Sequence, residues 1–150
     1  MTSQRSRPDL PTVEEESKPF WDAAREERFL ISRCGDCGRS HHYPRPFCPF
    51  CWSENVSFVE ASGRATLYTY STVFVNDLEP FRGRLPYVAA VVDLEEGPRV
   101  MTNVVGCDPG ALRIGQELEV AFEVRSDEVT VPVFRPSMSP KSSPRSGTTK

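Results

Sequence analysis

The stretch from Cys34 to Cys51 reads CGDCGRSHHYPRPFCPFC and contains two CxxC pairs, Cys34/Cys37 and Cys48/Cys51, with ten residues between them. Two residues between cysteines allow a tight turn to aim both sulfurs at one point. Four thiolates complete the tetrahedral shell that Zn²⁺ favours in structural sites, and they leave no position for water or substrate. The spacing therefore predicts one structural Zn²⁺ bound by these four cysteines. Bound iron and a redox-active dithiol are the alternatives.

Two histidines and a fifth cysteine are the other candidates for chemistry. His41 and His42 lie between the CxxC pairs and could replace a ligand or act as acid and base, but we interpret them as surface residues of a hairpin. A nucleophilic cysteine needs a nearby base, so Cys107 is interpreted as a buried, inert thiol. The sequence has no G-x-S-x-G, glycine-rich phosphate loop or H-E-x-x-H motif. We predict no catalytic residue and do not expect the chain to be an enzyme by itself.

The sequence after Gly63 has the pattern of β-strands. In 117–124, apolar residues alternate with polar ones, as in a strand with one buried face. The expected strands are 64–75, 87–94, 99–105, 117–124 and 129–134, with shorter strands at 29–33 and 56–61 around the cysteines. A long first strand followed by four shorter ones favours a small Greek-key barrel of the OB type, with an open sandwich as the alternative. Pro132 predicts an edge position for the last strand.

The expected organisation has five parts along the chain. These are a flexible leader (1–18), a short amphipathic helix (19–28), a cysteine-rich ribbon (29–61), the barrel (62–134) and a disordered Ser/Pro-rich tail (135–150). Pro19 suits the first turn of the helix. Phe20 and Trp21 form an apolar edge, and aromatic residues are typical interface anchors. We therefore predict that Phe20 and Trp21 bind a partner, with packing against the chain's own ribbon as the alternative.

The charge distribution bears on the class of partner. The chain has 150 residues and a formal net charge of −3, and residues 52–134 contain 6 Arg and no Lys against 13 Asp plus Glu, a net charge of −7. Binding of nucleic-acid phosphates needs Lys and Arg, so a nucleic-acid-binding module is the alternative function and is disfavoured. Apolar runs are too short to cross a bilayer. Five cysteines without an export signal favour a reducing compartment, which we take to be the cytoplasm.

A series of short motifs resembles a known family. The motifs are Pro19-Phe20-Trp21, Cys34-x-x-Cys37-Gly38, Tyr43-Pro44-Arg45, Cys48-Pro49-x-Cys51, Ser62-Gly63, Leu85-Pro86-Tyr87-Val88, Leu112-Arg113-Ile114-Gly115 and Phe134-Arg135-Pro136. This order resembles the acyl-CoA-associated proteins of domain of unknown function 35, which pair an N-terminal rubredoxin-like zinc ribbon with a C-terminal OB-fold. The resemblance covers about Pro19 to Pro136.

The resemblance implies an accessory subunit that works with a separate enzyme. The expected partner is a thiolase-fold enzyme, an aldolase or a hotdog-fold enoyl-CoA hydratase in lipid or sterol metabolism, and it would share acyl-CoA with this chain. Only the four cysteines carry over as site residues, as metal ligands. Arg82 and Arg84, in the loop before Pro86, are candidates for contact with a CoA phosphate. A stand-alone acyl-CoA enzyme such as a thioesterase is the third hypothesis, but it needs a base or nucleophile that the sequence does not reveal.

Overall fold

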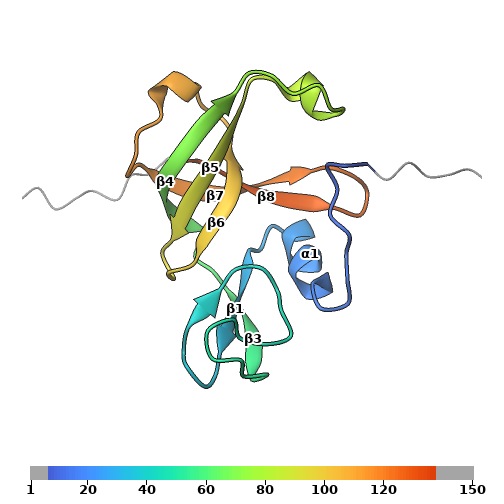
Figure 1. Cartoon of the computed structure of the whole chain (residues 1–150), viewed down its shortest axis with the longest axis vertical. Helices are drawn as coiled ribbons and strands as arrows, with labels where there is room; N and C mark the ends of the chain where they lie inside the picture. The colour runs from blue at the N-terminus through green and yellow to red at the C-terminus, as the bar shows by residue number, and fades with distance from the viewer. Residues whose placement is uncertain (1–6, 138–150) are drawn as a thin grey trace, which may run out of the picture.

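The computed structural model describes residues 7–137, so the part of the predicted tail at 138–150 lies outside the described residues. Within them the chain forms a closed five-stranded barrel, a three-stranded ribbon and one α-helix beside the ribbon (Figure 1). Mostly β structure with one short helix confirms the predicted fold class. Closure of the barrel excludes the open sandwich.

The barrel contains β4 (Arg64–Val73), β5 (Tyr87–Leu94), β6 (Arg99–Val104), β7 (Glu117–Val124) and β8 (Thr130–Pro136) in the order β4-β5-β6-β8-β7. Neighbouring strands are antiparallel except β6 and β8, which pair in parallel through Val104 and Phe134. The N–H of Val105 also donates to the carbonyl of Phe134 at 2.8 Å. The prediction of an edge position for β8 is wrong, because β8 lies between β6 and β7 in the closed barrel. Pro132 is tolerated there because β8 pairs with β6 only through Val104 and Phe134, so few backbone hydrogen bonds are needed on that side.

Alternation along each strand fills the barrel with apolar side chains. The buried set includes Leu67, Val88, Ala90, Val92, Leu94, Val100, Val104, Leu118 and Phe134. A register shift between Leu67 and Thr69 leaves Tyr68 without a partner on β5, and this bulge bends the long first strand. At the start of β4, Gly63 has φ +82° and approaches Val120 so closely that a Cβ would lie 2.6 Å from the Val120 side chain. Glycine is therefore required where the ribbon joins the barrel.

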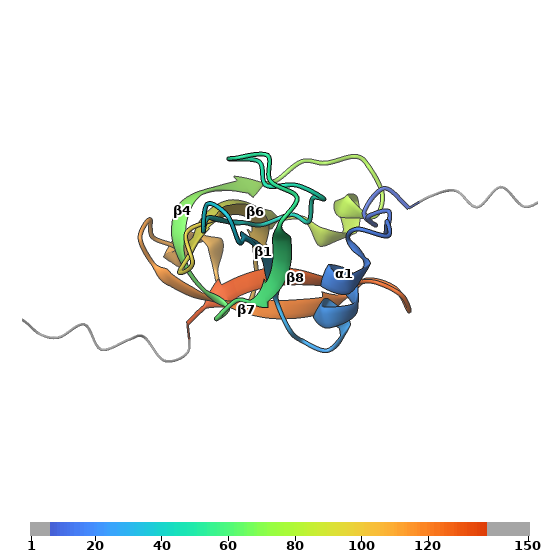
Figure 2. The same cartoon turned by 90° about the horizontal axis from the view of Figure 1, so that it is seen from below.

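The ribbon contains β1 (Leu30–Cys34), β2 (Ser40–His41) and β3 (Val56–Glu60) in the order β2-β1-β3, all antiparallel. It lies at one end of the barrel, and Figure 2 shows that end from below. The N–H of Ala61 donates to the carbonyl of Phe29 at 2.8 Å, which extends the β1–β3 pairing to the start of the barrel.

Helix α1 (Lys18–Arg25) is shorter than the predicted 19–28. It ends because Glu27 takes a left-handed conformation with φ 59°, and the N–H of Arg28 turns back to the carbonyl of Ala23 at 2.9 Å. The helix packs against β8, β7 and β1, so it covers the outside of the barrel next to the ribbon. No helix among residues 7–137 is long and apolar enough to span a membrane.

Part of the predicted flexible leader packs against the barrel. The guanidinium of Arg84 donates to the Asp9 carboxylate at 2.8 Å, and Arg7 donates to the carbonyl of Arg125 at 3.2 Å. Leu10 packs against the core. At the other end, β8 extends into the predicted tail, and Arg135 pairs with Glu119 at 2.9 Å.

Candidate functional site

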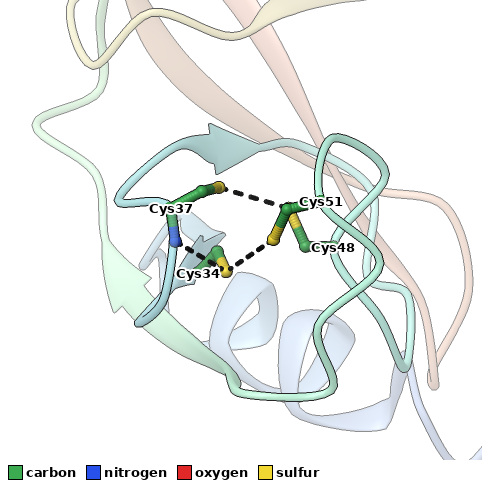
Figure 3. A group of neighbouring side chains, drawn as sticks. All are labelled: Cys34, Cys37, Cys48 and Cys51. Carbon is green, nitrogen blue, oxygen red and sulfur yellow. Dashed lines mark hydrogen bonds between the residues drawn. The ribbon is translucent and has the colours of Figure 1, made fainter.

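The four predicted cysteines face one another at the tip of the ribbon (Figure 3). Their sulfurs all lie within 4.8 Å of one another, and the Cys34–Cys51 and Cys37–Cys48 sulfur pairs are each 3.6 Å apart. Tetrahedral Zn²⁺ with bonds of about 2.3 Å needs sulfurs about 3.8 Å apart. The geometry and the all-thiol donor set therefore fit a single tetrahedral metal ion.

Each CxxC pair forms the same kind of turn. The N–H of Gly38 donates to the carbonyl of Cys34 at 3.0 Å, and the N–H of Trp52 donates to the carbonyl of Cys48 at 2.9 Å. In the first turn the N–H groups of Asp36 and Cys37 reach the Cys34 sulfur at 3.4 Å, and in the second turn the N–H of Phe50 reaches the Cys48 sulfur at 3.4 Å. These donors stabilise thiolates.

The cysteines differ in how readily they lose a proton. The N–H of Cys37 is the main group that lowers the pKa of the Cys34 thiol, to about 7. The N–H of Ser53 lowers the pKa of Cys51, but burial and hydrogen bonds with the other cysteines outweigh it and raise that pKa to about 12. Four thiols at these distances cannot all become thiolates without a compensating positive charge. A divalent cation supplies that charge, so the donor chemistry also fits a metal.

Asp36 connects the two turns. It accepts hydrogen bonds from the hydroxyl of Ser53 and from the side-chain amide of Asn55, the latter at 3.2 Å. These bonds lower the pKa of the Asp36 carboxyl. Gly35 lies against Asn55, where a Cβ would come within 2.5 Å of the amide nitrogen. A side chain at Gly35 would displace the Asn55 amide from Asp36, and Gly38 is needed for its φ of +76°.

The two histidines are not surface residues, contrary to the sequence-based interpretation. His41 is buried on β2, and His42 lies with its ring about 5.7 Å from the rings of both Phe20 and Phe29. Burial lowers the pKa of His42 to about 4, so this ring is neutral at physiological pH. His41 also has a lowered pKa because of burial. Phe20 of α1 and Phe29, the residue before β1, create this environment, and neither belongs to the hairpin.

The prediction that Phe20 and Trp21 bind a partner is corrected by the structure. Their side chains are only 2% and 7% exposed, and they pack inside this chain. Phe20 contacts Trp21 edge to face with ring centroids 4.9 Å apart, and Phe29 lies 6.1 Å from Phe20. The apolar edge of the helix is therefore covered by the chain's own ribbon and barrel.

The predicted arginine pair is split. Arg84 lines a cavity of about 460 Å³ together with Arg125 and Cys107, whereas Arg82 is absent from its lining and contacts Asp77 at 3.8 Å. Burial and the neighbouring Asp108 raise the pKa of the Cys107 thiol, which leaves it protonated. Arg125 was not predicted to lie at this site, and no local pattern marks it, because only closure of the barrel brings it to the same cavity as Arg84.

Comparisons with known proteins match both parts of the chain. Residues 21–57 match the family model described as ChsH2, rubredoxin-like zinc ribbon domain, and residues 58–123 match ChsH2, C-terminal OB-fold domain. A probable enoyl-CoA hydratase alpha subunit of Thermomonospora curvata is 35% identical over 85% of this chain, which spans only 40% of that relative's length.

Two further comparisons cover most of the matched protein. A DUF35 domain-containing scaffold protein of Methanocaldococcus jannaschii is 36% identical over 68% of this chain and 73% of its own length. A solved structure titled Ltp2-ChsH2(DUF35) aldolase is 35% identical, with a TM-score of 0.75 over 85% of this chain and 98% of that chain. The chain therefore belongs to the DUF35 family, in which it combines a ChsH2-type zinc ribbon with an OB-fold.

Proposed function

We propose that this protein is an accessory, non-catalytic or co-catalytic subunit of an acyl-CoA-metabolising enzyme complex in the cytoplasm. The observation that carries the proposal is the match over nearly the full length of the DUF35 chain in a structure whose title names an aldolase. The names of two other relatives, a hydratase alpha subunit and a scaffold protein, support the same role. The partner is a separate thiolase-like, aldolase or enoyl-CoA hydratase chain.

The chemistry of the large cavity supports an accessory role over a thioesterase. Its one thiol, Cys107, has a raised pKa, and its carboxylate, Glu123, contacts Arg125 at 2.9 Å. Hydrolysis of a thioester needs an activated nucleophile or a base. Neither group is arranged to supply one.

Purification of the tagged protein from its own host at low salt tests the proposed function. We expect one co-eluting chain in stoichiometric amount, and acyl-CoA turnover by the complex that exceeds turnover by either separated chain. A protein that elutes alone, or a partner without activity on acyl-CoA, would contradict the proposal.

A structural Zn²⁺ is the proposed cofactor, bound by Cys34, Cys37, Cys48 and Cys51. Structural zinc contributes roughly 10–16 kcal/mol to the folding of small modules. Cys48→Ser should therefore lose the metal and unfold the ribbon together with the barrel that shares its core, as measured by metal analysis and near-UV circular dichroism. Cys107→Ser is the matched control and should keep about one zinc per chain. Full metal content in Cys48→Ser, or iron in place of zinc, would refute the assignment.

Arg82 and Arg84 are proposed to contact a phosphate of acyl-CoA bound in the complex. Arg84 lines the large cavity. Arg82 does not line it but lies on the same 3₁₀ helix as Arg84, η1 (Phe81–Arg84). Guanidinium groups bind phosphates through paired N–H donors. The pairing of Arg84 with Asp9 reduces the charge available, so we infer that the partner supplies most of the affinity for CoA.

The alternative function, binding of single-stranded nucleic acid, has no support at Tyr68. Tyr68 is an exposed aromatic residue on β4, but the Arg99 guanidinium covers its ring at 3.6 Å, and Asp93 accepts a 2.7 Å hydrogen bond from Arg99. Base stacking on a strand needs an open ring beside a basic groove. Neither is present at this position.

A further inference from the structure

A pocket of about 140 Å³ lies where α1, the ribbon and the barrel meet. Its walls include one or more aromatic rings from each of these three parts of the chain: Phe20, Trp21, Phe29, His42 and Phe134. In proteins, a cavity of about 150 Å³ is large enough to hold one benzene molecule. The pocket therefore has both the volume and the aromatic walls to accept a single six-membered ring.

Trp21 brings an unused hydrogen-bond donor to this pocket. The residue is only 7% exposed, and its indole Nε1 is buried without a hydrogen-bond partner among residues 7–137. A buried indole N–H usually has a partner, because leaving it without one costs the free energy of its desolvation. The indole nitrogen can only donate. The group that would complete this wall is therefore a hydrogen-bond acceptor.

The walls of the pocket carry no charge. The described residues that line it include no Asp, Glu, Lys or Arg. Burial lowers the pKa of His42 to about 4, so its ring is neutral at physiological pH. Its Nδ1 is also buried without a hydrogen-bond partner in the described part of the chain. A charged ligand would lose its hydration here without an opposite charge to compensate, so the ligand that fits is uncharged.

An apolar ring with one hydroxyl matches these walls better than water does. Each water takes up about 30 Å³ and needs about two to four polar partners, so several waters in the pocket would face mostly apolar walls. A ring covers those walls instead, and its hydroxyl can both accept from an N–H and donate to an unprotonated imidazole nitrogen. Tyr43 and Met101 also line the pocket and are 44% and 80% exposed, so the pocket opens to the surface beside them.

We propose that this pocket binds a small uncharged compound of the phenol class, whose ring packs against Phe20 and Phe29 and whose oxygen accepts a hydrogen bond from the Trp21 indole. This inference goes beyond the proposed function and does not depend on it, because every residue that holds the ring belongs to this chain.

Nuclear magnetic resonance of the isotope-labelled full chain with zinc bound tests the proposal, with phenol itself as the probe. The chain has two tryptophans and therefore two indole N–H signals, and Trp52→Phe identifies the signal that belongs to Trp21. We expect phenol to move the Trp21 signal downfield with a dissociation constant of about 1 mM or lower. The Trp52 signal should stay in place. A Trp21 signal that does not move, or that benzene moves as far as phenol does, overturns the proposal.

A variant test isolates the hydrogen bond from the packing of the ring. Trp21→Phe removes the donor and keeps an aromatic side chain, and the ratio of phenol affinity to benzene affinity cancels the change in pocket size. We expect this ratio to fall about fivefold in Trp21→Phe. The matched control, Trp52→Phe, makes the same substitution at an exposed ring and should leave the ratio unchanged. An equal ratio in Trp21→Phe and the wild type overturns the proposal. If Trp21→Phe loses zinc or unfolds, the indole signal of the wild type decides.

Discussion

Trp52 occupies a position in the second cysteine turn that matches Gly38 in the first. Its φ is 66° and that of Gly38 is 76°, so both lie in the left-handed region. For a non-glycine residue this conformation costs roughly 1–2 kcal/mol. The Trp52 ring nevertheless stays 72% exposed and stacks on Phe47 with centroids 5.3 Å apart. The second turn therefore keeps an aromatic surface at the expense of backbone strain.

This strain predicts an unusual order of stability for two variants. Both Trp52→Gly and Trp52→Ala remove the ring, but only glycine relaxes the backbone, so the glycine variant should be more stable by about 1 kcal/mol. Chemical denaturation of the zinc-bound proteins measures the difference. Met101 lies on an extended strand, so the order should reverse there: Met101→Ala should be more stable than Met101→Gly. Equal stability of the two Trp52 variants would show that the turn relaxes without cost.

The neutral state of His42 makes stability depend on pH. Burial lowers the folded-state pKa from 6.5 to about 4. The unfolded chain therefore binds a proton that the folded chain rejects, and stability falls as the pH drops from 6.5 towards 4. Between pH 7.5 and 5.5 the loss should be about 1 kcal/mol. His42→Phe should remove this part of the pH dependence in urea titrations with zinc in excess. If the free energy of unfolding of His42→Phe depends on pH as steeply as that of the wild type, His42 is not the group responsible.

Elements whose periodicity is local were predictable from the sequence. Alternation, apolar runs and β-favouring residues placed the five barrel strands within two residues of their observed ends. The CxxC spacing identified the four cysteines that the structure brings together. In contrast, periodicity shows which edge of α1 is apolar but not what covers it, so the burial of Phe20 in its own chain was missed. The contact between Asp9 and Arg84 joins residues 75 positions apart, and only the folded barrel brings them together.

That contact connects the segment before α1 to η1, in the β4–β5 connection. Burial alone would raise the pKa of the Asp9 carboxyl, but hydrogen bonds from Arg84 and Arg7 outweigh it and lower the pKa below its usual value of 3.8. The folded chain therefore favours the charged carboxylate. Its contribution to stability is present at neutral pH and is lost as the pH falls below about 4.

Removal of the Asp9 carboxylate should free residues 7–17 from the barrel while the barrel stays folded. In Asp9→Ala we expect faster amide hydrogen exchange over residues 7–17 and over residues 74–86, with unchanged exchange in β5 and β6. Hydrogen exchange followed by mass spectrometry measures each segment. Asp77→Ala is the matched control, because Asp77 makes only a 3.8 Å contact with Arg82. Unchanged hydrogen exchange over residues 7–17 of Asp9→Ala would show that other contacts hold this segment on the barrel.

At the scale of the whole molecule, a column of aromatic rings joins the ribbon, the helix and the barrel. Phe20 of α1 lies 6.1 Å from Phe29 at the start of the ribbon, and Phe29 lies 6.1 Å from Phe134 on β8. Phe20, Phe29 and Phe134 are all buried in one continuous core. The metal-binding ribbon and the barrel are therefore expected to unfold as one cooperative unit.

Phe20→Ala tests this cooperativity. Loss of a buried phenylalanine typically costs 3–5 kcal/mol, so we expect the free energy of unfolding to fall by about 3 kcal/mol. Tryptophan fluorescence follows α1 and the ribbon through Trp21 and Trp52, and far-UV circular dichroism follows the strands. Both signals should shift to lower denaturant concentration together. Phe74→Ala, at an exposed position, should change stability by less than about 0.5 kcal/mol. A shift of the fluorescence signal alone would mean that the ribbon unfolds independently and that Phe20 stabilises only its own neighbourhood.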